Sequence, residues 1–188
     1  MRAFVAVVPP AEVVDHLDAF LEVRRAAAPF RWAAIEQLHL TLAFLAEVPD
    51  RKLDDLVDRL GRAGTRRTSF EAAVAGGGAF PNVARARVLW AGLDLDEPGR
   101  VELSRMATGA RAAANRAGIA VDGQRFRPHV TLARLGHPED VTSWVRLLDD
   151  YRGPAWTVDR LTLVASYLGE GPRRRPRYET LHEFTLSG

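Results

Sequence analysis

The chain has 188 residues, 47% of them hydrophobic and 27% charged, a composition typical of a globular protein with a proper core. The absence of cysteine excludes disulfides and thiolate metal sites and fits the reducing cytoplasm, where we expect the protein to be. The formal net charge is only +2, although the chain has 25 arginines and one lysine. No apolar run is long enough to span a bilayer, and the first residues resemble a strand rather than a signal peptide, so we expect no membrane association.

The first half of the chain predicts alternating strands and helices. Pro10 suits the first turn of a helix, and Asp50 can cap a second one. In chain order we predict a strand at 2–8, a helix at 10–27, a strand at 37–45, a helix at 50–64, a strand at 69–76 and a flexible glycine-rich loop at 76–82.

The same order then starts again. We predict a strand at 87–95, a helix at 98–117, a strand at 128–135, a helix at 138–148 and closing strands at 156–168 and 178–186. Two copies of one pattern indicate a two-fold internal repeat. No Pro- or Ser-rich linker separates the copies. We therefore expect one bilobal α+β domain over residues 1–188, with two pseudo-symmetric lobes of antiparallel sheet and helices around a central cleft.

A short histidine motif lies on the second strand of each half. The chain reads HLTLAFL from His39 and HVTLARL from His129, with five of seven positions identical. Five histidines and ten threonines predict about a quarter of one His-x-Thr by composition alone, so a matched pair is a strong repeat signal. An isolated copy would more often be a strand with a structural histidine.

Alternation along a strand places His39 beside Thr41 on one face, and His129 beside Thr131 on one face. Each imidazole and hydroxyl would lie about 7 Å apart along the strand. Histidine titrates near neutrality, so one imidazole can act as acid and the other as base. Threonine hydroxyls can donate to phosphate oxygens in a pentacoordinate transition state. The set therefore suits phosphoester chemistry without a metal or other cofactor.

Besides the two histidine motifs, further segments along the chain resemble one known family. They are FVAV with PP at the start, RW before LHLTLAFL, GAFPN followed by RVLWAGL, FRPHVTLAR, and SYLGEGPRRRPRYETL near the end. Over its whole length the chain resembles the 2H phosphoesterase superfamily, and more closely the bacterial and archaeal RNA 2′,3′-cyclic phosphodiesterases, also known as 2′-5′ RNA ligases.

The resemblance implies opening of a terminal RNA 2′,3′-cyclic phosphate to a 2′-phosphate, without ATP or metal. It implies His39 as the acid, His129 as the base, and Thr41 and Thr131 as phosphate-binding residues. The reverse reaction, with a 2′-hydroxyl in place of water, would give a 2′-5′ linkage, and ligation of tRNA halves is a property of the family. We expect a monomer whose partners are RNA 3′ ends.

Other residues carry weaker predictions. Arg127 beside the second motif and Tyr178 after the Arg-rich loop are predicted substrate contacts, whereas Arg134 should face away from His129 and be structural. Trp32 and Phe126 could stack a base or simply edge the core. Most arginines, the Arg66-Arg67 pair included, fit compositional drift. Asp94 and Asp96 have no His or Glu at ligand spacing nearby and are predicted turn residues.

Two alternative functions remain open at this point. One is an enzyme acting on small cyclic nucleotides or 2′-5′ oligonucleotides. The other is a non-catalytic RNA-binding protein, against which the intact histidines and threonines of both motifs speak.

Overall fold

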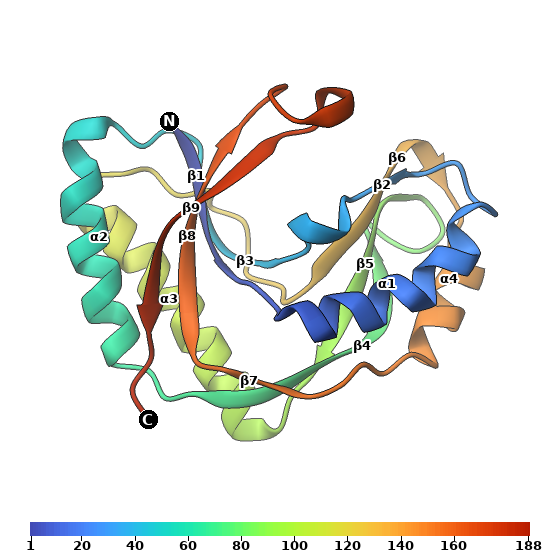
Figure 1. Ribbon diagram of the computed structural model, residues 1–188, viewed down its shortest axis with the longest axis horizontal. Coiled ribbons are helices and arrows are strands. Elements are labelled where there is room, and N and C mark those ends of the chain that lie inside the picture. The colour runs from blue at the N-terminus through green and yellow to red at the C-terminus, as the bar shows by residue number, and fades with distance from the viewer.

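A computed structural model describes residues 1–188, and its elements follow the predicted order (Figure 1). The helices are α1 (Ala11–Arg25), α2 (Asp50–Thr65), α3 (Glu97–Arg116) and α4 (Thr142–Asp149), with short 3-10 turns at Ile35–Gln37 and Pro172–Arg174. The strands are β1 (Arg2–Val7), β2 (Arg31–Trp32), β3 (Leu40–Leu45), β4 (Phe70–Phe80), β5 (Ala86–Asp94), β6 (Val130–Glu139), β7 (Trp156–Val158), β8 (Arg160–Tyr167) and β9 (Arg177–Thr185). No helix is long and apolar enough to cross a membrane.

The strands form one antiparallel series that is symmetric about its centre. Their order is β7-β4-β5-β6-β3-β1-β8-β9, and β2 pairs with β6 outside this series. The two motif strands, β3 and β6, are therefore the central neighbours, with three more strands on each side. They share a single residue pair, Leu40 with Val130, and the two halves of the sheet diverge from there (Figure 1). The predicted α+β fold with two pseudo-symmetric lobes is confirmed.

The lobes do not coincide with the two halves of the chain. Strands β8 and β9, from the end of the chain, continue the sheet beyond β1, and α3 packs against α2 and β3. In the opposite lobe, α4 packs against β4. Helix α1 also lies in this lobe, with the ring of Phe20 4.6 Å from that of Tyr151, just after α4. Each half of the sequence thus contributes to both lobes, which ties them together.

The glycine-rich segment at 76–82 is not the flexible loop that its composition predicted. Strand β4 continues through it and pairs with β5 as far as Phe80, opposite Val88. A Cβ at Gly77 would collide with the Leu148 side chain, and one at Gly78 with the ring of Trp90. These glycines therefore make room for two large side chains that pack across the strand.

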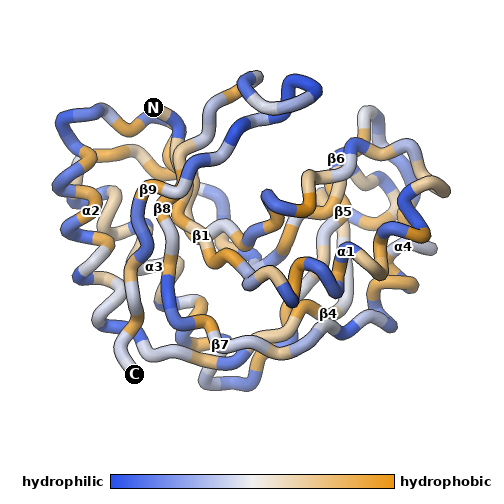
Figure 2. Tube along the Cα trace, viewed as in Figure 1, coloured by the Kyte–Doolittle hydropathy of each residue, from blue (hydrophilic) through white to orange (hydrophobic).

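The core lies between the sheet and the helices. The buried faces of α2 and α3 include Leu56 and Leu60 on α2, and Leu103 and Met106 on α3. Asp96 begins α3 by accepting a hydrogen bond from the Gly99 amide at 2.8 Å, the arrangement of a helix N-cap. Figure 2 shows the hydrophobic stretches along the strands and the hydrophilic loop that joins β8 to β9.

Candidate active site

Both histidine motifs line one cleft of about 800 Å³ between the lobes. His39, Thr41, His129 and Thr131 all contribute to its wall, as the strand alternation predicted. Its charged lining consists of five arginines and one acid: Arg2, Arg31, Arg134, Arg174, Arg175 and Asp122. The excess of positive charge favours an anionic ligand.

Two equivalent irregularities shape the strands that carry the motifs. The pairing of β3 with β1 skips Leu42, and that of β6 with β5 skips Leu132. An extra residue in a strand shifts the alternation of its side chains by one. Phe44 and Arg134, each three residues after the motif threonine, therefore line the cleft. The prediction that Arg134 faces away from His129 is wrong, because regular alternation ends at the bulge.

His39 is held on several sides. Its Nδ1 lies 2.7 Å from the Gln37 carbonyl oxygen, and its Nε2 lies 3.0 Å from Thr41 Oγ1. Its ring stacks on Phe4, with centroids 4.4 Å apart, and meets the edge of the Tyr178 ring at 5.7 Å. These contacts fix both the plane and the direction of the imidazole.

His129 has matching backbone support but different walls. Its Nδ1 lies 2.6 Å from the carbonyl oxygen of Arg127, again two residues before the histidine. The ring of Phe80 meets it edge-on at 4.8 Å, and Trp90 lies 6.0 Å away. His129 lies nearer to solvent than His39.

The two carbonyls determine which ring nitrogen carries the proton. A carbonyl oxygen can only accept, so Nδ1–H is the donor in both histidines. In each neutral ring Nε2 then holds the free lone pair, and in His39 it accepts a hydrogen bond from the Thr41 hydroxyl. Each Nε2 can accept a proton when neutral and donate one when charged, which is what a paired acid and base require.

Burial lowers the pKa of both histidines below the usual 6.5, although the hydrogen bond to the carbonyl partly opposes this in each. The charge of His129 further lowers the pKa of His39, and Arg134 further lowers the pKa of His129. The two imidazoles therefore sense each other electrostatically. Without a bound anion both are mainly neutral at pH 7.

The wall opposite Arg134 comes from the other lobe. Burial raises the pKa of Tyr178, and the charges of Arg2 and Arg134 oppose that rise. Arg2 lies over the ring of Phe44, with its Cζ 4.6 Å from the centroid. Tyr178 lines the cleft as predicted, and its phenol adds a hydrogen-bond donor.

Several cleft residues were not found from the sequence. Arg2 and Phe4 are two apart on β1 and share its cleft face, but only the sheet order reveals that β1 lies beside β3. Gln37 lines the cleft as well, and its side-chain amide donates to the Pro176 carbonyl at 2.8 Å, fastening the Arg-rich loop to the first motif.

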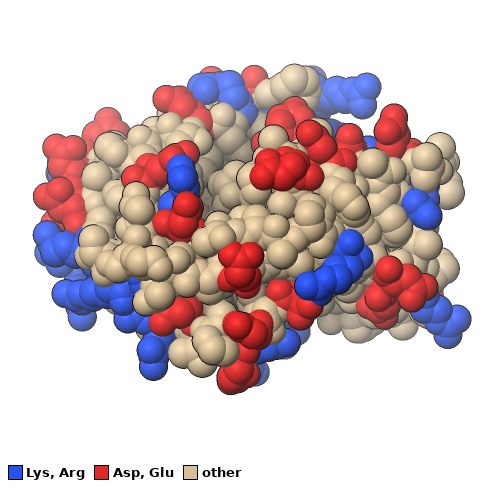
Figure 3. Space-filling model, turned by 60° about the horizontal axis from the view of Figure 1, so that its bottom comes forward, with Lys and Arg blue, Asp and Glu red and all other residues tan.

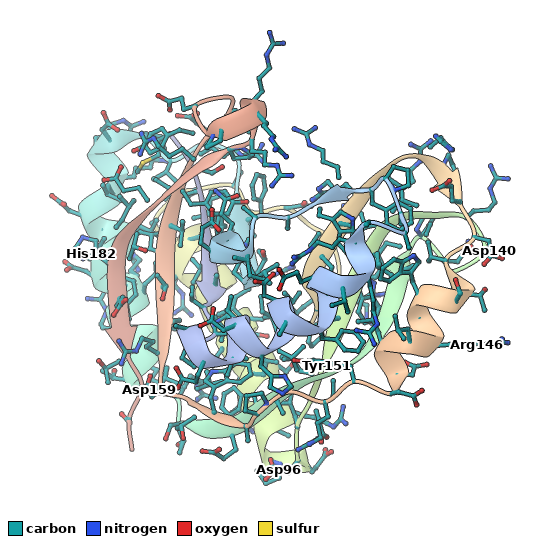
Figure 4. The ribbon with its side chains drawn as sticks, turned by 45° about the vertical axis from the view of Figure 1, so that its right-hand side comes forward. Asp96, Asp140, Arg146, Tyr151, Asp159 and His182 are labelled. Atoms are coloured by element: carbon teal, nitrogen blue, oxygen red, sulfur yellow. The ribbon has the colours of Figure 1, made fainter.

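Of the remaining candidates, Arg127 does not line the cleft, and its Cζ lies 6.0 Å from the centroid of the Phe80 ring. Trp32 lines the cleft, whereas Phe126 packs against the core. His182 lies on β9 towards the outside of its lobe (Figure 4). His16 on α1 pairs through Nδ1 with the Tyr151 hydroxyl at 2.8 Å.

Two antiparallel strands that each bring an imidazole and a hydroxyl into one basic cleft, within an α+β fold, define a 2H phosphoesterase. The chain belongs to the family of LigT-like phosphoesterases, whose model matches residues 7–90 and 93–173. A Thermus thermophilus protein named RNA 2′,3′-cyclic phosphodiesterase is 33% identical, over all of this chain and 91% of that protein. A protein of the same name from Escherichia coli K12 is 30% identical, over 99% of this chain and 97% of that protein.

Solved structures agree with the family. Escherichia coli LigT complexed with 3′-AMP matches with a TM-score of 0.78 at 30% identity, covering 100% of this chain and 98% of that one. The structure of TT0787 of Thermus thermophilus gives a TM-score of 0.78 at 32% identity, covering 100% of this chain and 99% of that one. The family predicted from the motifs is therefore confirmed.

Proposed function

We propose that the protein hydrolyses the terminal 2′,3′-cyclic phosphate of RNA to a 2′-phosphate, without ATP or a metal ion. The observation that carries the proposal is the pair of imidazoles in one cleft, each with Nδ1–H fixed by a carbonyl and Nε2 left for proton transfer. Relatives similar over the whole chain are named RNA 2′,3′-cyclic phosphodiesterase, which supports this substrate.

In the proposed step, neutral His129 takes a proton from water as the water oxygen attacks phosphorus. The bond from phosphorus to the 3′-oxygen breaks, and protonated His39 gives its Nε2 proton to that oxygen. The 2′-oxygen keeps the phosphate. His129 lies nearer to solvent than His39, which suits the activation of water. The rings of Phe4 and Tyr178 shield the His39 proton from solvent. A 2′-hydroxyl in place of water would form a 2′-5′ linkage with the same groups.

The bound anion also sets the protonation state that this mechanism needs. A phosphate beside the two rings favours the charged form of one imidazole, because an opposite charge nearby raises its pKa. Repulsion between the rings disfavours charging both. The substrate therefore promotes the singly protonated pair. Thr41, Thr131 and Arg134 line the same cleft, and we propose that their hydroxyls and guanidinium stabilise charge on the phosphate oxygens.

The loop at residues 168–176 extends the cleft beyond the reacting phosphate. Leu168, Arg174 and Arg175 line it, and we propose that the two arginines hold backbone phosphates of an oligonucleotide. We propose that the protein acts as a monomer. Arg127 would contribute only if its side chain leaves Phe80. We place the activity in the cytoplasm.

The test is incubation with an oligoribonucleotide ending in a 2′,3′-cyclic phosphate, in EDTA and without ATP. Phosphorus NMR identifies the product as a 2′- or 3′-phosphate. The proposal expects the 2′-phosphate at an undiminished rate in EDTA. No reaction in EDTA, or a 3′-phosphate product, would contradict it.

A further inference from the structure

A second basic hollow lies between α2 and α3. It has a volume of about 420 Å³, and its lining shares no residue with the catalytic cleft. Six guanidinium groups surround it, from Arg59, Arg62, Arg66, Arg67, Arg105 and Arg116. Its floor contains small residues, among them Ala63, Gly109 and Ala112, which keep the groove open between the helices.

The positive charge of this groove is only partly neutralised. Asp55 pairs with Arg59 at 3.0 Å, and Glu102 lies 3.9 Å from Arg67 and 4.0 Å from Arg105. Arg62, Arg66 and Arg116 are exposed and have no carboxylate within 4.0 Å. The net charge of the whole chain is only +2, so positive charge is concentrated here. Figure 3 shows Lys and Arg side chains gathered on the side of the molecule where α2 lies.

The spacing of the arginines forms two rows. Arg59 and Arg62 on α2 and Arg66 at its C-cap recur three and four residues apart, over about 10 Å of helix axis. Arg105 and Arg116 are three turns apart on α3, over about 16 Å. Each row is therefore long enough to meet several successive phosphates along one strand of a duplex. One guanidinium nitrogen, Arg67 Nη1, is buried without a hydrogen-bond partner.

The groove lies across the sheet from the catalytic cleft. Leu56 and Leu60 of α2 belong to the large core that includes Leu40 and Leu42 on one face of the sheet. On the cleft side, Phe4 and Val164 form a separate cluster with Phe44 and Tyr178. A group bound between α2 and α3 therefore cannot touch the reacting phosphorus. The groove can therefore contribute to substrate binding only if the ligand is large enough to reach around the lobe to the cleft.

We propose that this groove binds the phosphate backbone of a base-paired stem in a folded RNA. It would hold the body of an RNA whose 3′ end enters the cleft, and in that respect it rests on the proposed function. Guanidinium groups suit this partner because they bind phosphate oxygens bidentately. The groove would add affinity for structured RNA without reading its sequence.

The test measures binding of a stem–loop RNA with a 3′-hydroxyl end, which is not hydrolysed, by fluorescence anisotropy at 50 and 200 mM salt. The variant Arg62→Ala/Arg66→Ala/Arg116→Ala removes the three unpaired arginines. The control variant Arg85→Ala/Arg87→Ala/Arg146→Ala removes three exposed arginines outside both cavities. Three lost phosphate contacts should lower the salt slope by about 2.7, so wild-type affinity should fall about 40-fold more than that of the groove variant between the two salt concentrations.

Two further arms separate the possible outcomes. A triple Arg→Lys variant at the groove keeps the charge and should keep the salt slope. The ratio of kcat/KM for a stem–loop with a cyclic phosphate to that for a cyclic-phosphate dinucleotide should fall in the Ala variant and not in the control. A stem–loop Kd equal to the control would overturn the groove proposal, even if the wild-type protein hydrolyses the dinucleotide. The groove proposal would also be overturned if the Ala variant lost binding of inorganic tripolyphosphate but bound the stem–loop as tightly as the wild type. If the wild-type protein did not hydrolyse the dinucleotide, that result would contradict the proposed function instead.

Discussion

Replacing either cleft histidine with alanine should lower kcat/KM for a terminal 2′,3′-cyclic phosphate by about 10²–10⁴-fold, because general acid–base catalysis typically contributes that much. This corresponds to about 3–5 kcal/mol of activation free energy. His39→Ala removes the Nε2 that accepts from Thr41, and His129→Ala removes the imidazole whose pKa burial and the charge of Arg134 lower. The loss of kcat/KM in the double variant should be much smaller than the product of the two single losses, because both protons move in one transition state.

The assay follows release of 2′-phosphate from a cyclic-phosphate dinucleotide. Each ring also packs against an aromatic neighbour, Phe4 or Phe80, so truncation should cost roughly 0.5–1.5 kcal/mol of stability. A thermal melt must therefore show that each variant is folded at the assay temperature. Near wild-type turnover in either folded single variant would refute the paired-histidine mechanism.

A modified substrate separates the acid from the base. With sulfur in place of the 3′-oxygen, the leaving group is a thiolate that needs little protonation. This substrate should restore much of the rate in His39→Ala and little in His129→Ala, because only the acid becomes dispensable. The opposite pattern would exchange the two roles.

Four other predictions rest on the same geometry. Arg134→Ala should lower kcat/KM. It should also raise the pKa of His129, which moves the acid limb of the pH profile to higher pH. Arg134→Lys keeps the charge and should leave that limb in place. In the wild-type protein kcat/KM should be bell-shaped with its maximum below pH 6.5, because burial lowers both histidine pKa values; a rate that still rises above pH 7 would contradict this. Removing Arg174 and Arg175 together should flatten the salt dependence of oligonucleotide binding by about 1.4, at about 0.7 for each lost contact. Equal losses on a mononucleotide would instead mean that the loop shapes the cleft. Gly78→Ala should destabilise the fold by roughly 1–3 kcal/mol, because the new Cβ collides with Trp90; an unchanged melting temperature would refute that packing.

The sequence predicted those parts of the site that depend on local pattern. The repeated His-x-Thr located four cleft residues, because two-residue alternation holds from each histidine to its threonine. It failed one residue later, where the bulges at Leu42 and Leu132 turn Phe44 and Arg134 into the cleft. A bulge depends on how the neighbouring strand pairs, and no pattern within the motif reveals that pairing.

Long-range arrangement was likewise outside the reach of pattern. The elements of each half were found, but α1 joins a lobe whose strands come mostly from the second half, and α3 packs against α2 and β3 from the first half. Composition assigned flexibility to Gly77 and Gly78, whereas their role is to admit Leu148 and Trp90. Arg66 and Arg67 fitted compositional drift until α3 placed Arg105 and Arg116 opposite them. In each case the deciding neighbour lies far away in the sequence.

The internal symmetry explains why the protein has two proton-transfer groups, but not why their roles differ. Both histidines have the same carbonyl support two residues earlier, so each alone could accept or donate a proton at Nε2. Their walls break this equivalence, since Phe4 and Tyr178 enclose His39, whereas His129 has Phe80 at its edge and the charge of Arg134 nearby. A nearby cation favours the neutral ring, which is the form that a base requires. The position of Arg134, itself a consequence of the bulge at Leu132, therefore favours His129 as the base.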